Sequence, residues 1–543
     1  MKRNPAGNRP SVFLLLGGVI LGAIILVGSF CNLANYPTIW WDEAIFSETA
    51  ANLVQHGRYA FTVQSPDQLS DLDFRISVGP AVILPVALAY HILGVGVIPG
   101  RLVAGLYLVL TFLGLFWGAR RLWGARTALV AVVLALGGTD VFFWGRSVLG
   151  DIPALGLFLC GLGFLTKGLE EDSVRPLFLG GVFLGLAFDA KEFYGLAFLP
   201  PILVMTHHFW PHKGRLLRRL LAYGVGLSLP LLGYIALKWL ILGNLGTAVL
   251  HFFQQKQLLC HEFFTPFTIG RLYPESALYF LGHPLSWLGV MGVWWIWRRG
   301  AASPGERLWA GNFLLWSLFY LTSVYWQRFA LPALFLAAPL AAYFLGQAMA
   351  RLTPKCTVFS PRWLTAGMAL AFLMIYPLPA AEHLDQIVTR QADSPSRLVD
   401  YLRNNVSRQC LIETPEYELV FLDDDHQFHL MPEFFFLEAT PEKIELLNPR
   451  GKPYDFDRVG AEVLILGNVG KGLFRQIYPP ERIARWWLRV AQVECYDIYV
   501  SRKGGAKWLK RPPGPLSSIR VDGPLKPKFS PFEAPIIDHQ LYH

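Results

Sequence analysis

Two acidic motifs in the N-terminal third of the chain have residue types that could accept a proton. Asp42 and Glu43 follow a pair of tryptophans, and Asp151 ends the run GRSVLGD. A carboxylate within hydrogen-bond reach of a hydroxyl can act as its general base. Each aspartate could instead cap a helix, since Asp favours helix starts and Asp-Ile-Pro is a typical first turn. The residue types alone leave both roles open.

Several cations accompany these acids. Arg75, Lys191 and Arg328 each lie beside an apolar run. Arg and Lys side chains at such positions suit an anionic group, phosphate above all. For Arg328 we favour phosphate binding, and for Arg58 we favour ordinary snorkelling to the interface or pairing with a local acid. Arg146 precedes Asp151 by five residues and strengthens a functional interpretation of that motif.

The segments that carry these residues must lie in or beside a membrane. The 543-residue chain is 53% hydrophobic and only 16% charged, whereas a soluble chain is about 25% charged. Its mean hydropathy is +0.37. This composition excludes a disordered chain and a purely soluble enzyme, and it indicates a polytopic membrane protein.

The net charge of +9 belongs to the apolar part of the chain. Residues 1–380 carry 27 Lys and Arg against 16 Asp and Glu, while residues 381–543 carry 21 against 23. A nucleic-acid binder would concentrate positive charge on a soluble face or tail. Here the excess lies in short breaks between apolar runs, so we expect no nucleic-acid partner.

Twelve apolar runs are long enough to be considered as spans, and they lie at 11–30, 78–95, 101–118, 127–143, 153–166, 176–190, 193–209, 220–242, 276–297, 308–324, 330–348 and 363–380. Basic residues favour the cytoplasmic side. If the run at 78–95 does not cross, most of them fall on that side. That run also contains Pro80, Pro85 and His91, which suits a helix lying in the interface.

We therefore predict eleven spans, a cytoplasmic N-terminus and an extracytoplasmic C-terminus in the cell membrane. In this topology Asp42 and Asp151 face the same outer compartment. Residues 31–100 form the first outer loop. Within it, residues 43–56 are predicted to form a short amphipathic helix that Gly57 ends.

After this membrane domain, 1–380, the sequence predicts a soluble outer α/β or α+β domain at 381–503. Residues 384–406 have a helical pattern, and strands are expected at 410–414, 463–467 and 495–502. The Pro-, Gly- and Lys-rich residues 504–543 predict an extended tail. Cys410 and Cys495 could form a disulfide in an oxidising compartment, although two free thiols are favoured.

The outer domain also contains a dense acid and histidine run. Asp423, Asp424, Asp425, His426 and His429 could bind a divalent cation, but a solvated turn is the favoured interpretation. The sequence requires no cofactor, and we assign no metal ligands.

Four motifs together resemble the GT-C fold glycosyltransferases that use lipid-phosphate sugars. The likeness is greatest to glycosyltransferase family 39, which holds the dolichyl-phosphate-mannose–protein mannosyltransferases and the lipid A aminoarabinose transferase. It covers roughly residues 8–380, and its motifs are WWDEAIFSETAANLVQHGRYAF at 40–61, GRSVLGDIPAL at 145–155, GLAFDAK at 185–191 and YWQRFALPALFLAAP at 325–339.

The resemblance assigns roles to individual residues. Asp42 matches the loop acid taken as catalytic base, Glu43 completes the acidic pair, and Asp151 matches the second-loop acid. Lys191 and Arg328 match cations of the family motifs. Arg75 falls near a family lysine that contacts the donor phosphate, but the proline that normally follows is absent. Ala190 also replaces the usual Thr before Lys191.

These observations predict a transferase that moves a sugar from a polyprenyl-phosphate donor to an acceptor hydroxyl on the outer face. A single attacking base implies inversion at the anomeric carbon. The acceptor could be a protein, a lipid or a glycan. The alternative is a lipid or glycan transporter or flippase, which usually shows mid-membrane charges and paired repeats.

Overall fold

The computed structural model describes residues 12–64, 68–73, 76–264, 274–322, 326–352, 379–390, 394–430, 454–472, 474–475 and 477–503. The chain divides into two compact units. The helical unit comprises 1–37 and 77–390, and the sheet unit comprises 38–76 and 391–543. The chain therefore passes between the two units three times.

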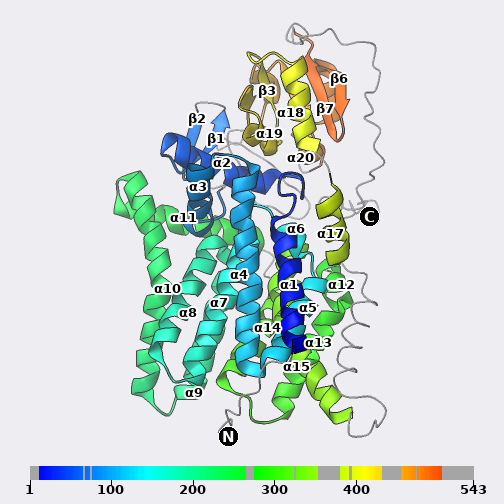
Figure 1. Ribbon diagram of the computed structural model, residues 1–543. Coiled ribbons are helices and arrows are strands. Elements are labelled where there is room, and N and C mark those ends of the chain that lie inside the picture. Colours follow the sequence, from blue (N-terminus) through cyan, green and yellow to red (C-terminus); the bar gives the residue numbers. More distant parts are fainter. Residues whose placement is uncertain are drawn as a thin grey trace, which may run out of the picture. The chain divides into compact units, whose positions relative to one another are not determined.

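The helical unit is built from long apolar helices (Figure 1). Leu, Ala, Val and Phe fill them, and most breaks between them carry Gly, Pro or charged residues. Its helices are α1 (Val12–Phe30), α3 (Pro80–Leu93), α4 (Val97–Trp123), α5 (Ala125–Gly137), α6 (Val141–Trp144), α7 (Asp151–Glu170), α8 (Val174–Ala190), η1 (Glu192–Phe198), α9 (Leu199–Phe209), α10 (Lys213–Leu242), α11 (Leu245–Phe264), α12 (Pro274–Gly282), α13 (Pro284–Arg298), α14 (Pro304–Leu321), α15 (Gln327–Leu352) and α17 (Pro379–Thr389).

Among the described residues, four helices are long and apolar enough to cross a membrane: α4, α7, α10 and α15. Shorter apolar helices form at Leu14–Phe30, Pro80–Leu93 and Ala125–Gly137. The predicted span at 276–297 is divided between α12 and α13. Most of the predicted span at 363–380 lies outside the described residues, and the count of eleven remains a prediction.

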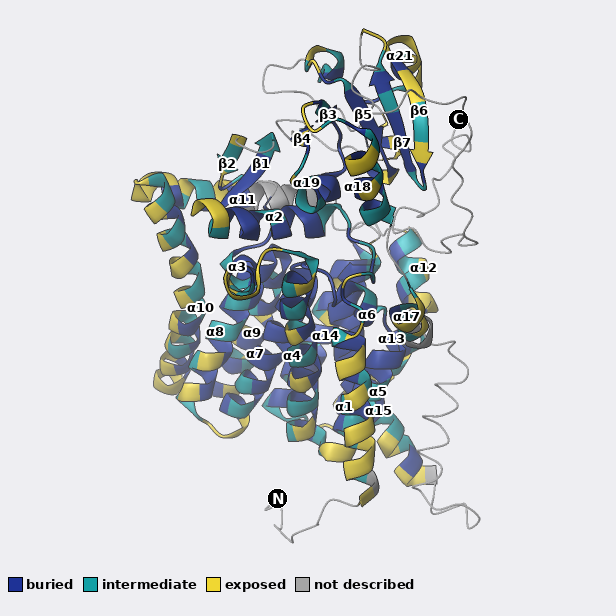
Figure 2. Ribbon diagram, turned by 45° about the horizontal axis from the view of Figure 1, so that its top comes forward, coloured by how far each residue is buried: buried dark blue, intermediate teal, exposed yellow. Residues whose placement is uncertain are grey.

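Burial separates inner from outer helices. Of an apolar 18-residue segment within α7, 89% is buried, whereas only 17% of the corresponding segment of α10 is buried. Leu and Val side chains are exposed along α1 and α10 (Figure 2). An apolar surface of this extent needs a non-aqueous neighbour, so these two helices present faces suited to lipid.

Contacts within the helical unit bring together helix ends that the distribution of basic residues assigned to the same side of the membrane. Arg121 in the last turn of α4 pairs with Glu171, which follows α7. Arg219 near the start of α10 pairs with Asp172, and the N–H of Gly305 in α14 donates to Glu170. The predicted cytoplasmic loops therefore meet at one end of the helices.

At the opposite end, Arg146 donates to carbonyl oxygens of Gly28 and Cys31 at the end of α1. Two segments on the same side of a membrane must be separated in the chain by an even number of membrane-spanning helices. In the predicted topology the runs at 101–118 and 127–143 would supply these two crossings, and the run at 78–95 would not cross.

The sheet unit contains one seven-stranded mixed sheet in the order β2-β1-β4-β3-β5-β7-β6. Strand β3 runs parallel to β4 and β5, and the other pairs are antiparallel. Its elements are α2 (Trp41–His56), β1 (Ala60–Gln64), β2 (Gln68–Asp71), α18 (Ser394–Asn405), β3 (Leu411–Glu413), α19 (Tyr417–Leu422), β4 (Gln427–His429), η3 (Phe456–Arg458), β5 (Val463–Leu466), α20 (Asn468–Lys471), α21 (Pro480–Trp486), β6 (Trp487–Val493) and β7 (Tyr496–Ser501).

Strand β5 shows how the sheet is buried on both faces. Val463 and Ile465 belong to the apolar cluster that includes α18 residues. Leu464 and Leu466 belong to a second cluster that includes Ile483 of α21. Successive side chains of a strand point to opposite faces, so the continuous run Val-Leu-Ile-Leu is what a two-faced core requires.

The structure divides the chain differently from the predicted domain order. Strands β3, β5 and β7 lie where the sequence predicted strands. The predicted helical region 384–406 is divided between α17 and α18, which belong to different units. Residues 38–76, expected within the membrane domain, fold with the C-terminal residues instead. The predicted tail at 504–543 lies outside the described residues.

Candidate functional site

Asp151 is a buried acid at the start of α7. It is 4% exposed, and in the described structure neither carboxylate oxygen has a hydrogen-bond partner. The N-cap residue is Gly150, without a side-chain cap bond, so Asp151 does not cap its helix. Burying a carboxylate without hydrogen bonds costs several kcal/mol in general. A buried acid that the described residues leave without a hydrogen-bond donor is a candidate for chemistry.

Arg328 lies beside Asp151, with Nη1 3.8 Å from Oδ2. It is the second residue of α15 and is 3% exposed. The guanidinium carbon lies 4.3 Å from the centre of the Trp326 ring and 5.7 Å from that of Trp144. Aromatic faces attract a guanidinium, so these rings help to hold Arg328 in place. The contact with Asp151 is looser than a bidentate hydrogen-bonded pair.

Lys191 lies at the same end of the helical unit, immediately after α8. It is 3% exposed, and its Nζ lies 5.8 Å from the centre of the Phe193 ring. A Cβ on Gly150 would stand 3.2 Å from Cδ of Lys191 and 2.4 Å from the Ala190 carbonyl oxygen. The glycine before Asp151 therefore permits the close approach of Lys191. The structure brings Asp151, Lys191 and Arg328 together, as the shared sidedness predicted.

Asp189 is a positioning residue that sequence reasoning missed, although it lies in the quoted motif GLAFDAK. Its Oδ2 accepts a hydrogen bond from the N–H of Ala81 (2.7 Å), and its carbonyl accepts one from Gly79 (2.9 Å). Gly79 is the N-cap residue of α3. Asp189 thus satisfies open N–H groups at the start of α3, and it ties that short helix to the end of α8.

Arg146 has a structural role rather than the functional one suggested by its proximity to Asp151. It is fully buried and donates to carbonyl oxygens of Gly28 (2.5 Å), Tyr36 (3.1 Å) and Cys31. Carbonyls at a helix end are open acceptors and carry partial negative charge. Arg146 therefore fastens the second outer loop to the end of α1.

Asp42 and Glu43 belong to the first turn of α2, in the sheet unit. The helix begins at Trp41, and its N-cap residue Trp40 makes no side-chain cap bond. Asp42 is thus inside the helix and not its cap. Asp42 is half-buried and Glu43 is 1% exposed. The predicted end of the helix is confirmed, because Gly57 follows it with φ +66°.

The other predicted cations have different outcomes. Arg75 lies outside the described residues. Arg58 pairs with Asp71 through two hydrogen bonds of 2.9 and 2.7 Å. Local pairing, one of the interpretations favoured for Arg58, is therefore confirmed.

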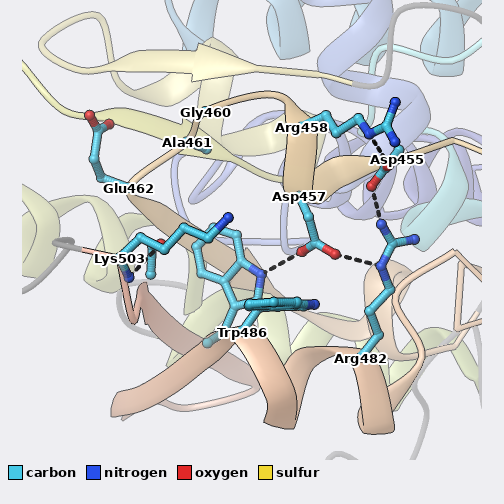
Figure 3. Close-up of a pocket in the computed structure, with 11 residues that line it drawn as sticks. Asp455, Asp457, Arg458, Gly460, Ala461, Glu462, Arg482, Trp486 and Lys503 are labelled. Carbon is cyan, nitrogen blue, oxygen red and sulfur yellow. Dashed lines mark hydrogen bonds and ion pairs between the residues drawn. The ribbon is translucent and has the colours of Figure 1, made fainter.

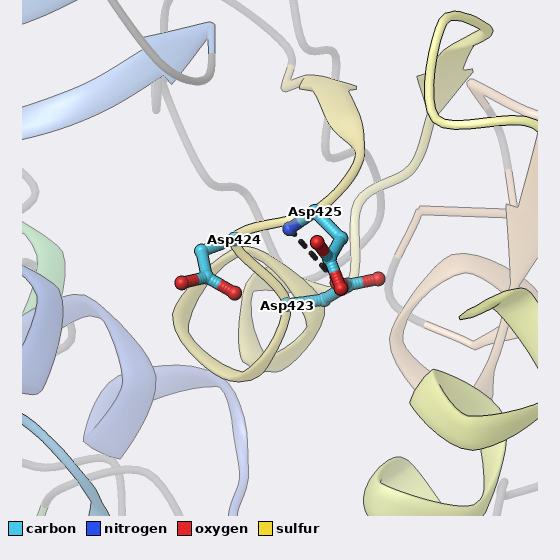
Figure 4. A group of neighbouring side chains, drawn as sticks. All are labelled: Asp423, Asp424 and Asp425. Carbon is cyan, nitrogen blue, oxygen red and sulfur yellow. Dashed lines mark hydrogen bonds between the residues drawn. The ribbon is translucent and has the colours of Figure 1, made fainter.

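The acid run Asp423–Asp425 forms a turn in the sheet unit (Figure 4). Its carboxylates have basic partners. His426 Nδ1 lies 2.7 Å from Asp423 Oδ2. Arg403 lies 3.2 Å from Asp425 and 3.5 Å from Asp423. His429 takes no part in this turn and contacts Glu413 instead. The turn is thus held by ion pairs within the protein.

A polar cavity of about 480 Å³ opens elsewhere in the sheet unit (Figure 3). Asp457 accepts hydrogen bonds from Arg482 (2.5 Å) and from the Trp487 indole (3.0 Å). Asp455 pairs with Arg482 and with Arg458. The cavity includes none of the predicted site residues, and its two aspartates are held by these neighbours.

The two cysteines of the sheet unit are free thiols, as the sequence favoured. Cys410 is buried and Cys495 half-buried. Burial is the main reason that the pKa of each thiol rises to about 12. Both therefore remain protonated and unreactive at neutral pH.

Comparison with known proteins gives the fold. The family model described as dolichyl-phosphate-mannose-protein mannosyltransferase matches residues 77–239. This range contains Asp151 and Lys191 but neither Asp42 nor Arg328. No curated protein sequence matches the chain.

Several solved structures are similar to this chain, and two of them are described here. ArnT from Cupriavidus metallidurans, bound to undecaprenyl phosphate, matches with a TM-score of 0.60 and 16% identity over 90% of this chain and 98% of that chain. The archaeal oligosaccharyltransferase AglB from Archaeoglobus fulgidus, in complex with an inhibitory peptide and a dolichol-phosphate, matches with a TM-score of 0.56 and 12% identity, over 94% and 75%. The chain has the GT-C fold of multi-pass membrane glycosyltransferases, as its motifs predicted.

Proposed function

We propose that this chain is a membrane glycosyltransferase that moves a sugar from a polyprenyl-phosphate donor to an acceptor hydroxyl. The GT-C fold and the mannosyltransferase family match support this class of reaction. The observation that carries the assignment is the buried Asp151 carboxylate, without a hydrogen bond in the described structure, beside Arg328 and Lys191. Two buried cations at one helix end are suited to the phosphate of a lipid-linked sugar.

The chemistry needs charge stabilisation where the donor breaks. As the anomeric carbon–oxygen bond breaks, negative charge grows on the departing phosphate. Arg328 and Lys191 are proposed to stabilise that charge. Asp151, whose Oδ2 lies 3.8 Å from Arg328 Nη1, is proposed to hold the guanidinium by its charge. Because the donor lipid and the enzyme lie in the same membrane, the position and orientation of the donor are already restricted before it binds.

The acceptor side needs a base. Asp42, in the first turn of α2, is proposed to take the proton of the acceptor hydroxyl as that oxygen attacks the anomeric carbon. Attack opposite the leaving phosphate inverts the configuration at that carbon. Glu43 is the next residue in the sequence and is buried. Its charge is proposed to contribute to the electrostatics of this first turn of α2. Reaction on the extracytoplasmic face, in an eleven-span topology, is part of the same proposal.

The test is turnover of purified full-length protein with a radiolabelled polyprenyl-phosphate sugar and acceptor-containing membranes. Asp42→Asn should lower kcat by about 10²–10⁴-fold. Asp71→Asn is the matched control, because Asp71 is an acid of the same segment that pairs with Arg58. It should leave kcat near the native value. Equal turnover of Asp42→Asn and native protein would remove Asp42 as the base.

A donor titration separates the enzyme from the rival transporter class. Arg328→Ala should raise the donor KM and lower transfer, whereas unchanged donor affinity would contradict a phosphate role for Arg328. Movement of the labelled lipid across a vesicle membrane, without transfer or hydrolysis, would support a transporter instead.

A further inference from the structure

We propose that Tyr417, in the C-terminal part of the chain, is a positioning residue for Asp42. This inference rests on the proposed function, because it concerns the helix that carries the proposed base. It gives residues beyond 390 a part in the reaction that no single stretch of sequence suggests.

The segment that carries Asp42 is part of the C-terminal sheet. Strand β1 pairs antiparallel with β4, with Gln64 opposite His429. The N–H of Leu430 donates to the carbonyl of Val63 at 3.1 Å. The hairpin β1–β2 thereby extends a sheet whose other strands all come from beyond residue 410. Segment and sheet are one folded unit.

Aromatic contacts fix the start of α2 within this unit. The Trp41 ring stacks on Tyr417 of α19, with centroids 5.2 Å apart and planes at 20°. The ring of Phe474 meets Trp41 edge-on at 5.8 Å, and Phe61 of β1 meets Tyr417 edge-on at 5.2 Å. Tyr417 is 3% exposed. One buried ring thus contacts both the first residue of α2 and the strand that follows the helix.

The remainder of α2 is held by other groups. Asn52 donates to the carbonyl of Ala60 (3.1 Å) and to Thr62 Oγ1 (3.0 Å), which fixes the C-terminal half of the helix against β1. The first turn has no side-chain cap. Loss of the Tyr417 ring should therefore loosen the first turn selectively while leaving the end of the helix in place.

Asp42 follows Trp41 directly, so movement of the Trp41 backbone moves the carboxylate. A displacement of about 1 Å can cost on the order of 10²-fold in rate. The donor-binding cations Lys191 and Arg328 belong to the other unit. A defect in positioning Asp42 should consequently appear in kcat and not in the donor KM.

The experiment compares Tyr417→Ala with Tyr417→Phe in purified full-length protein, using the radiolabelled polyprenyl-phosphate sugar. Tyr417→Ala should lower kcat by about 10–10²-fold with the donor KM unchanged. Tyr417→Phe, which keeps the ring of the stack, should retain a clearly higher kcat than Tyr417→Ala. Hydrogen exchange of amides 41–46 should be faster in Tyr417→Ala than in Tyr417→Phe.

Tyr401→Ala is the matched control. Tyr401 is a half-buried tyrosine that packs against a different cluster of the same unit. It should lower thermal stability without a selective loss of kcat. Native kcat in Tyr417→Ala, or an equal loss of kcat in Tyr401→Ala, would overturn the positioning role.

The two proposals fail differently. If Asp42→Asn abolishes transfer while Tyr417→Ala keeps native kcat, positioning is wrong and the proposed function stands. If Asp42→Asn keeps native turnover, the base assignment is wrong and the positioning role falls with it.

Discussion

The two units of this protein hold their buried charges in opposite ways. In the helical unit, Arg146 and Arg101 are fully buried, and both donate to main-chain carbonyl oxygens. In the sheet unit, Glu413 is fully buried and accepts hydrogen bonds of 2.8 Å from Tyr454 and Tyr478. The first unit stabilises cations with backbone acceptors, and the second stabilises an anion with phenol donors.

This difference distinguishes structural from functional charge. Arg146 and Glu413 have several hydrogen bonds each, as buried charges generally require. Asp151 has none within the described residues and relies on a cation 3.8 Å away. A buried charge with full hydrogen bonding serves the fold, whereas one with an unused bonding capacity is a candidate for substrate chemistry.

The largest expected effect is the loss of Arg146. Arg146→Ala leaves the carbonyl oxygens of Gly28 and Tyr36 without this buried donor, and removing a partner from such a site costs about 3–5 kcal/mol. We expect little folded protein by fluorescence-detected size-exclusion chromatography.

Arg328→Ala should retain far more folded protein, because that guanidinium makes a looser contact with its acid. If both variants lose the same amount of folded protein, the proposed division between structural and functional charge in the helical unit is wrong.

An intermediate effect is expected in the sheet unit. Glu413→Ala removes the acceptor of two tyrosine hydroxyls and should cost about 3 kcal/mol, or about 6–12 °C in Tm for a domain of this size. A thermal melt followed by intrinsic fluorescence measures the shift. Glu413→Gln keeps an acceptor and should cost less. A smaller loss for Ala than for Gln would show that hydrogen bonding does not hold this glutamate.

The smallest effect concerns pH and the buried pair Glu416 and Glu418. Glu416 accepts hydrogen bonds from the N–H groups of Gly467 (2.7 Å) and Gly470 (2.8 Å). Glu418 accepts one from Tyr496 (2.8 Å). Burial, reinforced by the Glu416 charge, raises the pKa of Glu418 well above its ordinary value.

A raised carboxyl pKa favours the protonated folded state. The associated stability is complete below the ordinary glutamate pKa and is lost as pH rises through the folded-state value. The Tm of the sheet unit should therefore fall from pH 5 to pH 8, and Glu418→Gln should flatten that fall by a few degrees, the shift that about 1 kcal/mol produces. An identical pH profile in Glu418→Gln would exclude Glu418 as its source.

Local signals explain what the sequence could predict. Val463–Leu466 is a run of β-branched and aliphatic residues, and it forms a strand where expected. The distribution of basic residues grouped the helix ends correctly, because sidedness depends on charges that are visible in the chain. Sidedness in turn predicts that Asp151, Lys191 and Arg328 share one end of the helical unit, where all three lie.

Long-range pairing explains what the sequence could not predict. Nothing near Gln64 indicates that its strand partner is His429, so residue types alone do not reveal that residues 38–76 group with the C-terminal residues. Proximity in sequence suggests that Arg146 acts with Asp151, yet its acceptors lie at residues 28, 31 and 36. Every residue has a backbone carbonyl, so residue types do not indicate which carbonyls will accept hydrogen bonds from Arg146.

The pairing of β1 with β4 has a consequence for biosynthesis. Gln64 leaves the ribosome long before His429 exists, and at about 5–20 residues per second the interval is roughly 20–70 s. During that time the β1–β2 hairpin has no sheet to join, and the Trp41 ring has no Tyr417 to stack against. The contacts around the helix that carries the proposed base are thus completed only after residues 77–390 have been synthesised.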